Sequence, residues 1–185
     1  MALQAEQPAA IGVQPPQQGN YSVLPVPYYP SEESNWCWAA CGQMIGALVQ
    51  GTVTDQCNFA QAVSPNSNCC QDKDSCNFEL DVTTTDMVDK VFGVIGKTAD
   101  FLPQPISFLE LQDQIANRLL PVQVGFKWND GDGHVAVVCG VSSQQDEPQV
   151  YVNDPIYGAG WVDLNSLQSA YGLGGSWQWT WTLEG

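Results

Sequence analysis

The chain has 185 residues, enough for one domain with a substantial core, and no apolar run approaches the roughly 18 residues of a transmembrane helix. Twenty acidic side chains against five basic ones give a net charge of −15. Because nucleic acids and anionic membranes bind basic surfaces, this balance argues against both as partners.

The N-terminal part, residues 1–24, is predicted to be a tail or a propeptide remnant, and residues 25–185 a single folded domain. Residues 1–20 are rich in Gln, Pro and Ala and show no periodicity. They lack a basic region followed by an apolar one, so they form no signal peptide as they stand, although they could remain after signal removal. Residues 21–30 contain several prolines and are predicted to lie extended over the domain.

A helix is predicted to begin near Cys37, because Ser34 or Asn35 can accept a hydrogen bond from a free N–H of its first turn. Free N–H groups and the positive end of the helix dipole favour an anion there, so the Cys37 thiol should lose its proton readily and act as a nucleophile. Apolar side chains then recur at helical spacing and can bury one face: Cys41, Met44, Ile45 and Leu48.

Seven cysteines in a chain of this length are typical of an oxidising environment. With Cys37 free, six remain, and four of them fall in the polar residues 55–77, which are predicted to be a loop held by two disulfides: Cys57, Cys69, Cys70 and Cys76. The pairing stays open. Zinc is the alternative, but the adjacent pair Cys69-Cys70 fits no usual ligand spacing.

The two cysteines outside this cluster, Cys41 and Cys139, are predicted to be buried thiols. Cys139 lies five residues after His134, so in a regular strand the two side chains point to opposite faces. This parity argues against a bridge between Cys41 and Cys139.

Helices are predicted to come first along the chain and antiparallel strands later, which indicates an α+β domain. Residues 83–92 and 107–119 are predicted helices, the second opening with a capping-box pattern. A helical turn is predicted at about residues 165–171, and strands at residues 122–128, 133–141, 150–154, 160–164 and 177–181. In the last strand Trp177, Trp179 and Trp181 alternate with polar residues, so all three are expected on one face, packed on the sheet.

The chain contains one histidine, His134, at the start of a β-branched run bounded by glycines. A nucleophilic cysteine needs a base, and Asp154, at the end of a later strand, could hold the imidazole in the required tautomer. Each residue has a structural alternative. Cys37 and His134 could be ordinary buried side chains, Asp154 could merely start a turn, and Asn153 could orient the histidine instead.

Three motifs carry a resemblance to a known family: Asn35–Ala40, Gly133–Val138 and Asn153–Pro155. They resemble the papain-like cysteine peptidases of bacterial secreted effectors and the related peptidases that trim bacteriocin leaders. The cysteine cluster and the closing Gly174–Trp177 segment extend the likeness from about Pro25 to the C-terminus. The resemblance implies a papain-like fold, with the nucleophile helix of an N-terminal helical part packed on an antiparallel sheet. It also implies cysteine peptidase chemistry by a Cys-His-Asp triad.

The chain departs from the family pattern at one position. Papain-like enzymes usually carry a glutamine six residues before the nucleophile, whose side-chain amide donates to the developing oxyanion; here that residue is Ser31. Losing one such donor costs about 3 kcal/mol, roughly a hundredfold in rate. Ser31, Asn35 or Gln43 is expected to substitute, unless the loop is shifted or the activity is weak. The backbone N–H of Cys37 is the other expected donor.

Together these patterns predict a secreted, monomeric cysteine endopeptidase that acts on a protein or peptide through a thioester. No metal or organic cofactor is expected, and residues 130–133, which carry too few ligands for calcium, are predicted to form a hairpin turn. A transglutaminase-like acyl-transfer enzyme would use the same triad. A catalytically inactive extracellular binding module of the same fold is the alternative from a different class.

Overall fold

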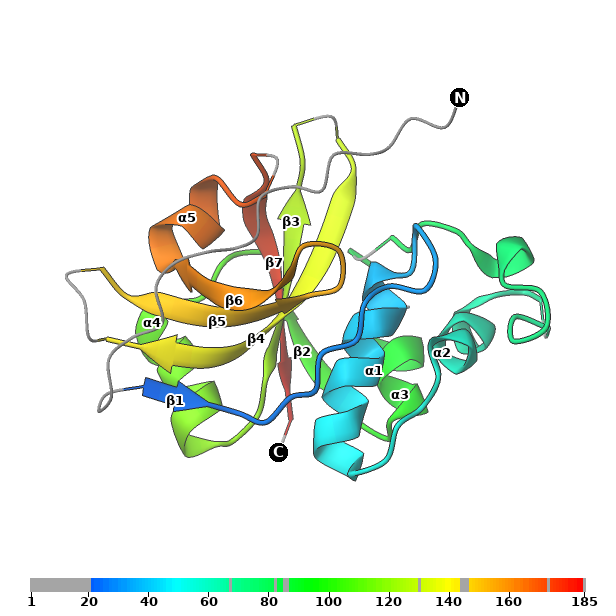
Figure 1. Ribbon diagram of the computed structural model, residues 1–185, viewed down its shortest axis with the longest axis horizontal. Coiled ribbons are helices and arrows are strands. Elements are labelled where there is room, and N and C mark those ends of the chain that lie inside the picture. The colour runs from blue at the N-terminus through cyan, green and yellow to red at the C-terminus, as the bar shows by residue number, and fades with distance from the viewer. Residues whose placement is uncertain are drawn as a thin grey trace.

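The computed structural model describes residues 21–66, 68–81, 83–84, 87–129, 131–143, 147–172 and 174–184. Seven strands form one antiparallel sheet, and the helices pack around it (Figure 1). The predicted α+β class, with the helix of Cys37 packed on the sheet, is confirmed. None of the helices in the described part of the chain is long and apolar enough to cross a bilayer.

The strand order is β2-β7-β3-β4-β5-β6, and β1 pairs with β4 off this path. The strands are β1 Tyr21–Val23, β2 Ala99–Leu102, β3 Val122–Lys127, β4 Gly133–Ser142, β5 Gln149–Asp154, β6 Gly158–Asp163 and β7 Ser176–Leu183. Every strand predicted from the sequence is present, and β1 and β2 were not anticipated. The tail was predicted to span residues 1–24. Residues 1–20 of it lie outside the described residues, and the domain boundary stays a prediction.

Three helical elements gather on one side of the sheet, and α4 and α5 lie away from them (Figure 1). The helices are α1 Cys37–Gln50, α2 Gln56–Val63, α3 Phe92–Val94, α4 Phe108–Gln112 and α5 Leu164–Ser169. Short 3₁₀ or π-helical turns cover Asp74–Cys76, Met87–Val91 and Asp113–Asn117. The predicted capping box is present before α4, where Ser107 and Glu110 bond reciprocally.

Helix α1 begins at Cys37, as predicted, but the expected cap is wrong. The residue before the first turn is Trp36, which makes no side-chain capping bond. Ser34 and Asn35 instead hydrogen-bond with Asn77, which lies some forty positions later in the chain. A long-range partner therefore replaces the local one that the spacing suggested.

Residues 55–77 were predicted to be a loop, but helix α2 forms their first part. Its Phe59 and Ala60 are fully buried. The ring of Phe59 approaches α1 so closely that a Cβ at Gly42 would lie 2.7 Å from it. Burial of this short apolar face against α1 outweighs the polar composition that favoured a loop.

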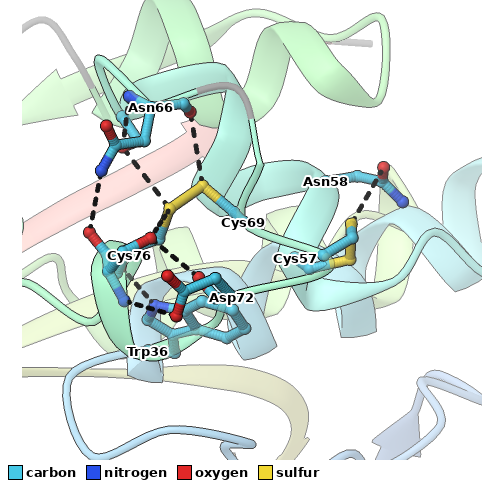
Figure 2. Close-up of a disulfide and its surroundings, with 10 residues drawn as sticks. Trp36, Cys57, Asn58, Asn66, Cys69, Asp72 and Cys76 are labelled. Atoms are coloured by element: carbon cyan, nitrogen blue, oxygen red, sulfur yellow. Dashed lines mark hydrogen bonds between the residues drawn. A yellow bond between two sulfur atoms is a disulfide. The ribbon is translucent and has the colours of Figure 1, made fainter.

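Two disulfides close this part of the chain, Cys57–Cys70 and Cys69–Cys76 (Figure 2). The prediction of two bridges among these four cysteines is confirmed. Cys41 and Cys139 are free and buried, also as predicted. Burial raises the pKa of Cys139 to about 12, so this thiol stays protonated at physiological pH.

The three tryptophans of β7 do not share one face, contrary to the prediction. A bulge between Gly125 and Phe126 shifts the register, so that Trp177 pairs with Phe126 and Trp179 pairs with Gly125. Since neighbouring residues of β3 point to opposite faces, Trp177 lies opposite Trp179 and Trp181. The latter two cover Gly125, where a Cβ would lie 2.9 Å from the Trp181 ring.

Candidate active site

Cys37 is the first residue of α1, half-buried, and opens onto a pocket of about 430 Å³. The pocket is lined by the residues just before and after Cys37, by Glu79 and Leu80, by the β3–β4 connection and by Ile156. His134 lies in the same lining. This pocket is therefore lined by both the single histidine of the chain and the cysteine that begins α1.

His134 is the second residue of β4 and pairs with Phe126 of β3. Its ring is only 2% exposed and stacks on Trp128, with centroids 5.6 Å apart. Tyr157 closes the ring edge-on at 5.8 Å. Two aromatic neighbours and the β4 backbone thus hold the imidazole in one orientation.

The two ring nitrogens of His134 have different surroundings. Nε2 lies 2.8 Å from Oδ2 of Asp154, and the ring lines the same pocket as Cys37. Because Nε2 is committed to the carboxylate, Nδ1 is the nitrogen that remains for the thiol. The three side chains form a line from Cys37 through His134 to Asp154.

Asp154 ends β5 and is fully buried. Its Oδ1 accepts from the backbone N–H groups of Ile156 at 2.8 Å and Tyr157 at 2.9 Å, which also starts the turn into β6. Its Oδ2 accepts from His134 and from the Tyr171 hydroxyl, both at 2.8 Å. Four donors compensate for the loss of water around the carboxylate. The turn-forming and the histidine-orienting interpretations of Asp154 therefore hold at once.

Burial works against both charges of the pair, yet their attraction prevails. Burial alone would raise the pKa of Asp154, but the charge of His134 and hydrogen bonds from His134, Tyr157 and Ile156 hold it below its usual value. Burial alone would lower the pKa of His134, but the charge and hydrogen bond of Asp154, then the interactions with Cys37, raise it above its usual value. The site favours an imidazolium beside a carboxylate.

The structure brings only one of the auxiliary candidates to the pocket. Asn35 lines it beside Cys37. Ser31 points elsewhere, its hydroxyl donating to the Glu33 carbonyl at 2.7 Å. Gln43 is buried within the helical layer, where its Oε1 accepts from Gln56 at 2.9 Å. Asn153 is buried next to Asp154 in β5 but donates to the Val26 carbonyl at 3.0 Å, so it does not contact His134.

Sequence reasoning missed two residues that hold the site. Tyr171 follows α5 and reaches Asp154, while its ring stacks on Phe126 with centroids 4.4 Å apart. Asn77 binds the residues that precede Cys37. Neither stands in a periodic pattern or a spaced motif, so the sequence held no local signal for them.

Residues 20–169 match the family described as papain-like cysteine protease AvrRpt2. The chain belongs to this family. The papain-like cysteine peptidase activity inferred from the three motifs is confirmed, and the Cys37–His134–Asp154 line lies within the matched residues. Tyr171 lies just beyond them.

Among solved structures, the AvrRpt2-family chain is similar to the peptidase domain of Streptococcus ComA, a bifunctional ABC transporter involved in a quorum-sensing pathway. The two share 13% identity with a TM-score of 0.56, over 85% of this chain and 97% of that chain. At this identity the likeness shows the fold alone. A comparison with curated proteins finds no match.

Proposed function

We propose that this cysteine peptidase hydrolyses peptide bonds with Cys37 as nucleophile, His134 as general base and acid, and Asp154 as the residue that orients His134. The observation that carries the proposal is the buried His134–Asp154 pair, 2.8 Å apart, whose His134 lines the same pocket as half-buried Cys37. An activated thiol needs a base beside it and a group that orients the base, and this arrangement supports both roles.

In the proposed reaction His134 holds the proton taken from Cys37 as an imidazolium, and the Cys37 thiolate attacks the peptide carbonyl carbon. The oxyanion receives a hydrogen bond from the backbone N–H of Cys37, which lies at the start of α1, where N–H groups have no intrahelical partner. Collapse breaks the C–N bond and leaves a thioester, while His134 protonates the leaving amine. Water, deprotonated by His134, then cleaves the thioester and restores the thiol.

Asn35 is the proposed side-chain donor to the oxyanion, in place of the glutamine that the family usually carries. Its position in the pocket lining supports this assignment, because the other two candidates, Ser31 and Gln43, bond away from the pocket. An amide presents two N–H donors. One can therefore serve the substrate while the other stays bound to the protein.

The test measures alkylation of the native, non-reduced protein by iodoacetamide between pH 4 and 9, with peptide mapping. The expected result is rapid modification of Cys37 at acidic pH, which His134→Ala abolishes. Cys41 and Cys139 are buried, should stay unmodified, and serve as internal controls. Cys37 labelling that is slow at acidic pH and indifferent to His134→Ala would refute the proposal. Retention of peptide hydrolysis by Cys37→Ala would refute it as well.

The same preparation separates the two rival activities. An acyl-transfer enzyme would incorporate an added primary amine into the cleaved peptide in place of water, and mass spectrometry of the products detects this. An inactive binding module would show no turnover of a proteome-derived peptide library. The proposed endopeptidase cleaves internal bonds and yields only hydrolysis products.

We also propose that the protein acts outside the cytosol, as a monomer. Support for the first part comes from two disulfides within one short stretch, which form and persist in oxidising compartments. Thiol counting on denatured protein purified from the culture medium should find three free thiols. Light scattering should give a mass near 20.1 kDa. Seven free thiols in the active protein would contradict the first part, and twice this mass the second.

A further inference from the structure

The residues before Cys37 are held from outside their own segment. These residues, 30–36, are called the nucleophile loop below, and residues 56–66 and 68–77, which carry both disulfides, the stapled segment. Gln56 donates to the Pro30 carbonyl at 2.8 Å and accepts from the Glu32 backbone N–H at 3.0 Å. Lys73 forms an ion pair with Glu32 at 2.8 Å. The far end of the nucleophile loop thus rests on the stapled segment.

The end of the loop nearest Cys37 rests on the same segment. The indole N–H of Trp36 donates to the Cys76 carbonyl at 2.8 Å, and Figure 2 shows the Trp36 ring next to Cys76 of the Cys69–Cys76 disulfide. The side chain of Asn77 accepts from the Asn35 backbone N–H through Oδ1 and donates to the Ser34 hydroxyl through Nδ2, both at 3.0 Å. Both polar ends of the Asn77 amide are therefore used on the loop.

Asn77 also contacts the Asn35 side chain. Its backbone carbonyl accepts from Nδ2 of Asn35 at 3.4 Å. Because Nδ2 carries two hydrogens, this bond fixes one and leaves the other for an acceptor in the pocket that Asn35 lines. The backbone N–H of Asn35 also bonds to Asn77, so Asn77 holds both the backbone and the side-chain amide of Asn35.

We propose that Asn77 is a positioning residue, which aims the Asn35 side-chain amide at the oxyanion and so compensates for the missing glutamine at Ser31. This inference rests on the proposed function, since it requires Cys37 to be the nucleophile. The Cys69–Cys76 bridge ends one residue before Asn77 and fixes the chain there. A donor built in this way depends on residues far from the nucleophile in the sequence.

The experiment is a double-mutant cycle of Asn35→Ala, Asn77→Ala and the double variant. It is assayed on a quenched fluorescent peptide selected from a proteome-derived library by the wild-type enzyme. Asn35→Ala should lower kcat about a hundredfold, as for loss of one oxyanion donor, and Asn77→Ala about tenfold, each with little change in KM. The double variant should be no slower than Asn35→Ala. Asn68→Ala, an exposed asparagine of the stapled segment, is the matched control and should behave as wild type.

Alkylation of Cys37 by iodoacetamide separates positioning from a general loss of structure. Displacement at the iodomethyl carbon forms no oxyanion, so Asn77→Ala should leave the labelling rate of Cys37 within about twofold of wild type. A wild-type kcat in Asn77→Ala or Asn35→Ala overturns the proposal. So does a further tenfold loss on adding Asn77→Ala to Asn35→Ala, or a parallel loss of alkylation. Turnover by Cys37→Ala would instead overturn the proposed function itself.

Discussion

At the scale of single residues, a tyrosine outside the proposed triad binds the carboxylate of Asp154. Tyr171 is almost fully buried and donates to the same oxygen of Asp154 that His134 uses. Burial, and then the charge and hydrogen bond of Asp154, raise the pKa of Tyr171 far above its usual value, so its hydroxyl remains a donor. It therefore competes with the imidazolium for the charge of the carboxylate and fixes its orientation.

Tyr171→Phe keeps the ring stacked on Phe126 and removes only the hydroxyl. A hydrogen bond to a charged group contributes about 1.5–3 kcal/mol, so the free energy of unfolding should fall by about 2 kcal/mol. The carboxylate, with one donor fewer, should attract the His134 proton more strongly and raise the pKa of His134 further. NMR titration can follow this shift without assignment, since the chain has one histidine.

Tyr151→Phe is the control for this change, because Tyr151 packs edge-on against Trp161 away from the pocket. It should leave the imidazole titration unchanged. An unchanged titration in Tyr171→Phe as well would mean that the hydroxyl exerts no influence on the pair.

The His134–Asp154 pair also makes stability depend on pH. The pKa of Asp154 is lower in the folded protein than in the unfolded chain, where it is about 3.9. Ionised Asp154 therefore stabilises the fold above about pH 3.9, and this contribution is lost as the pH falls through the pKa of the folded state. The raised pKa of His134 stabilises the fold below about 6.5, and that contribution is lost as pH rises through the folded pKa. The pair therefore stabilises the protein most between about pH 4 and 6.5.

Asp154→Asn should cost about 3–5 kcal/mol within this window, because it leaves a buried imidazole facing a neutral amide. Urea unfolding of both proteins from pH 3 to 9 measures the difference. The difference should shrink toward both ends of the range. A constant difference across the range would show that the lost stability comes from the turn at Ile156 and Tyr157 and not from the charge pair.

The residues of the site differ in how far the sequence could predict them. Cys37 and Asp154 carry local signals, a motif at a helix start and an acid before a proline, and His134 has no competitor in the chain. Asn35 was one of several candidates, and only its place in the pocket distinguishes it from Ser31 and Gln43. Tyr171 and Asn77 act through contacts between distant segments, which no pattern in a single sequence encodes.

At the scale of elements, the position of α1 depends on glycine. The layer that carries Cys37 comes close to α2 because Gly42 has no side chain where the Phe59 ring lies. The helical pattern of apolar residues predicted α1 correctly. It did not predict α2, since the stretch is short and mostly polar and its helical state depends on packing against α1.

Gly42→Ala tests this contact. Alanine favours a helix by up to about 1 kcal/mol over glycine, but its Cβ would lie 2.7 Å from the buried Phe59 ring. Overpacking of this kind costs about 1–3 kcal/mol, so the melting temperature should fall. Gly93→Ala, at an exposed helical glycine whose Cβ would meet nothing within 4 Å, is the matched control and should be neutral or stabilising. A higher melting temperature in Gly42→Ala would show that α2 moves aside freely.

The β-bulge between β3 and β7 sets a limit on what strand patterns can predict. Alternation placed Trp177, Trp179 and Trp181 on one face, and a single register shift moved Trp177 to the other. Bulges arise from how two strands fit each other, and this one lies beside Gly125, where the Trp181 ring occupies the space of a side chain. The strands were thus predictable from their own residues, whereas their register was not.

At the scale of the whole molecule, the net charge of −15 weakens the fold through self-repulsion. Added salt screens this repulsion. The exposed ion pair Lys73–Glu32 is screened too, but such pairs contribute at most about 1 kcal/mol. The melting temperature should therefore rise between 20 and 500 mM NaCl. Sucrose at equal osmolality controls for solute exclusion. A melting temperature that falls as NaCl is added would indicate that attractive ion pairs outweigh the repulsion.

The strand order has a consequence for how the enzyme comes into being. Strand β7 follows every other strand along the chain, yet it lies inside the sheet, between β2 and β3. Until residues 176–183 are synthesised and inserted, β3 lacks a neighbour on one side, and the sheet that supports His134 and Asp154 is incomplete. We therefore expect a chain that lacks β7 to be inactive, because β3, the neighbour of the strand that carries His134, would then have an open edge.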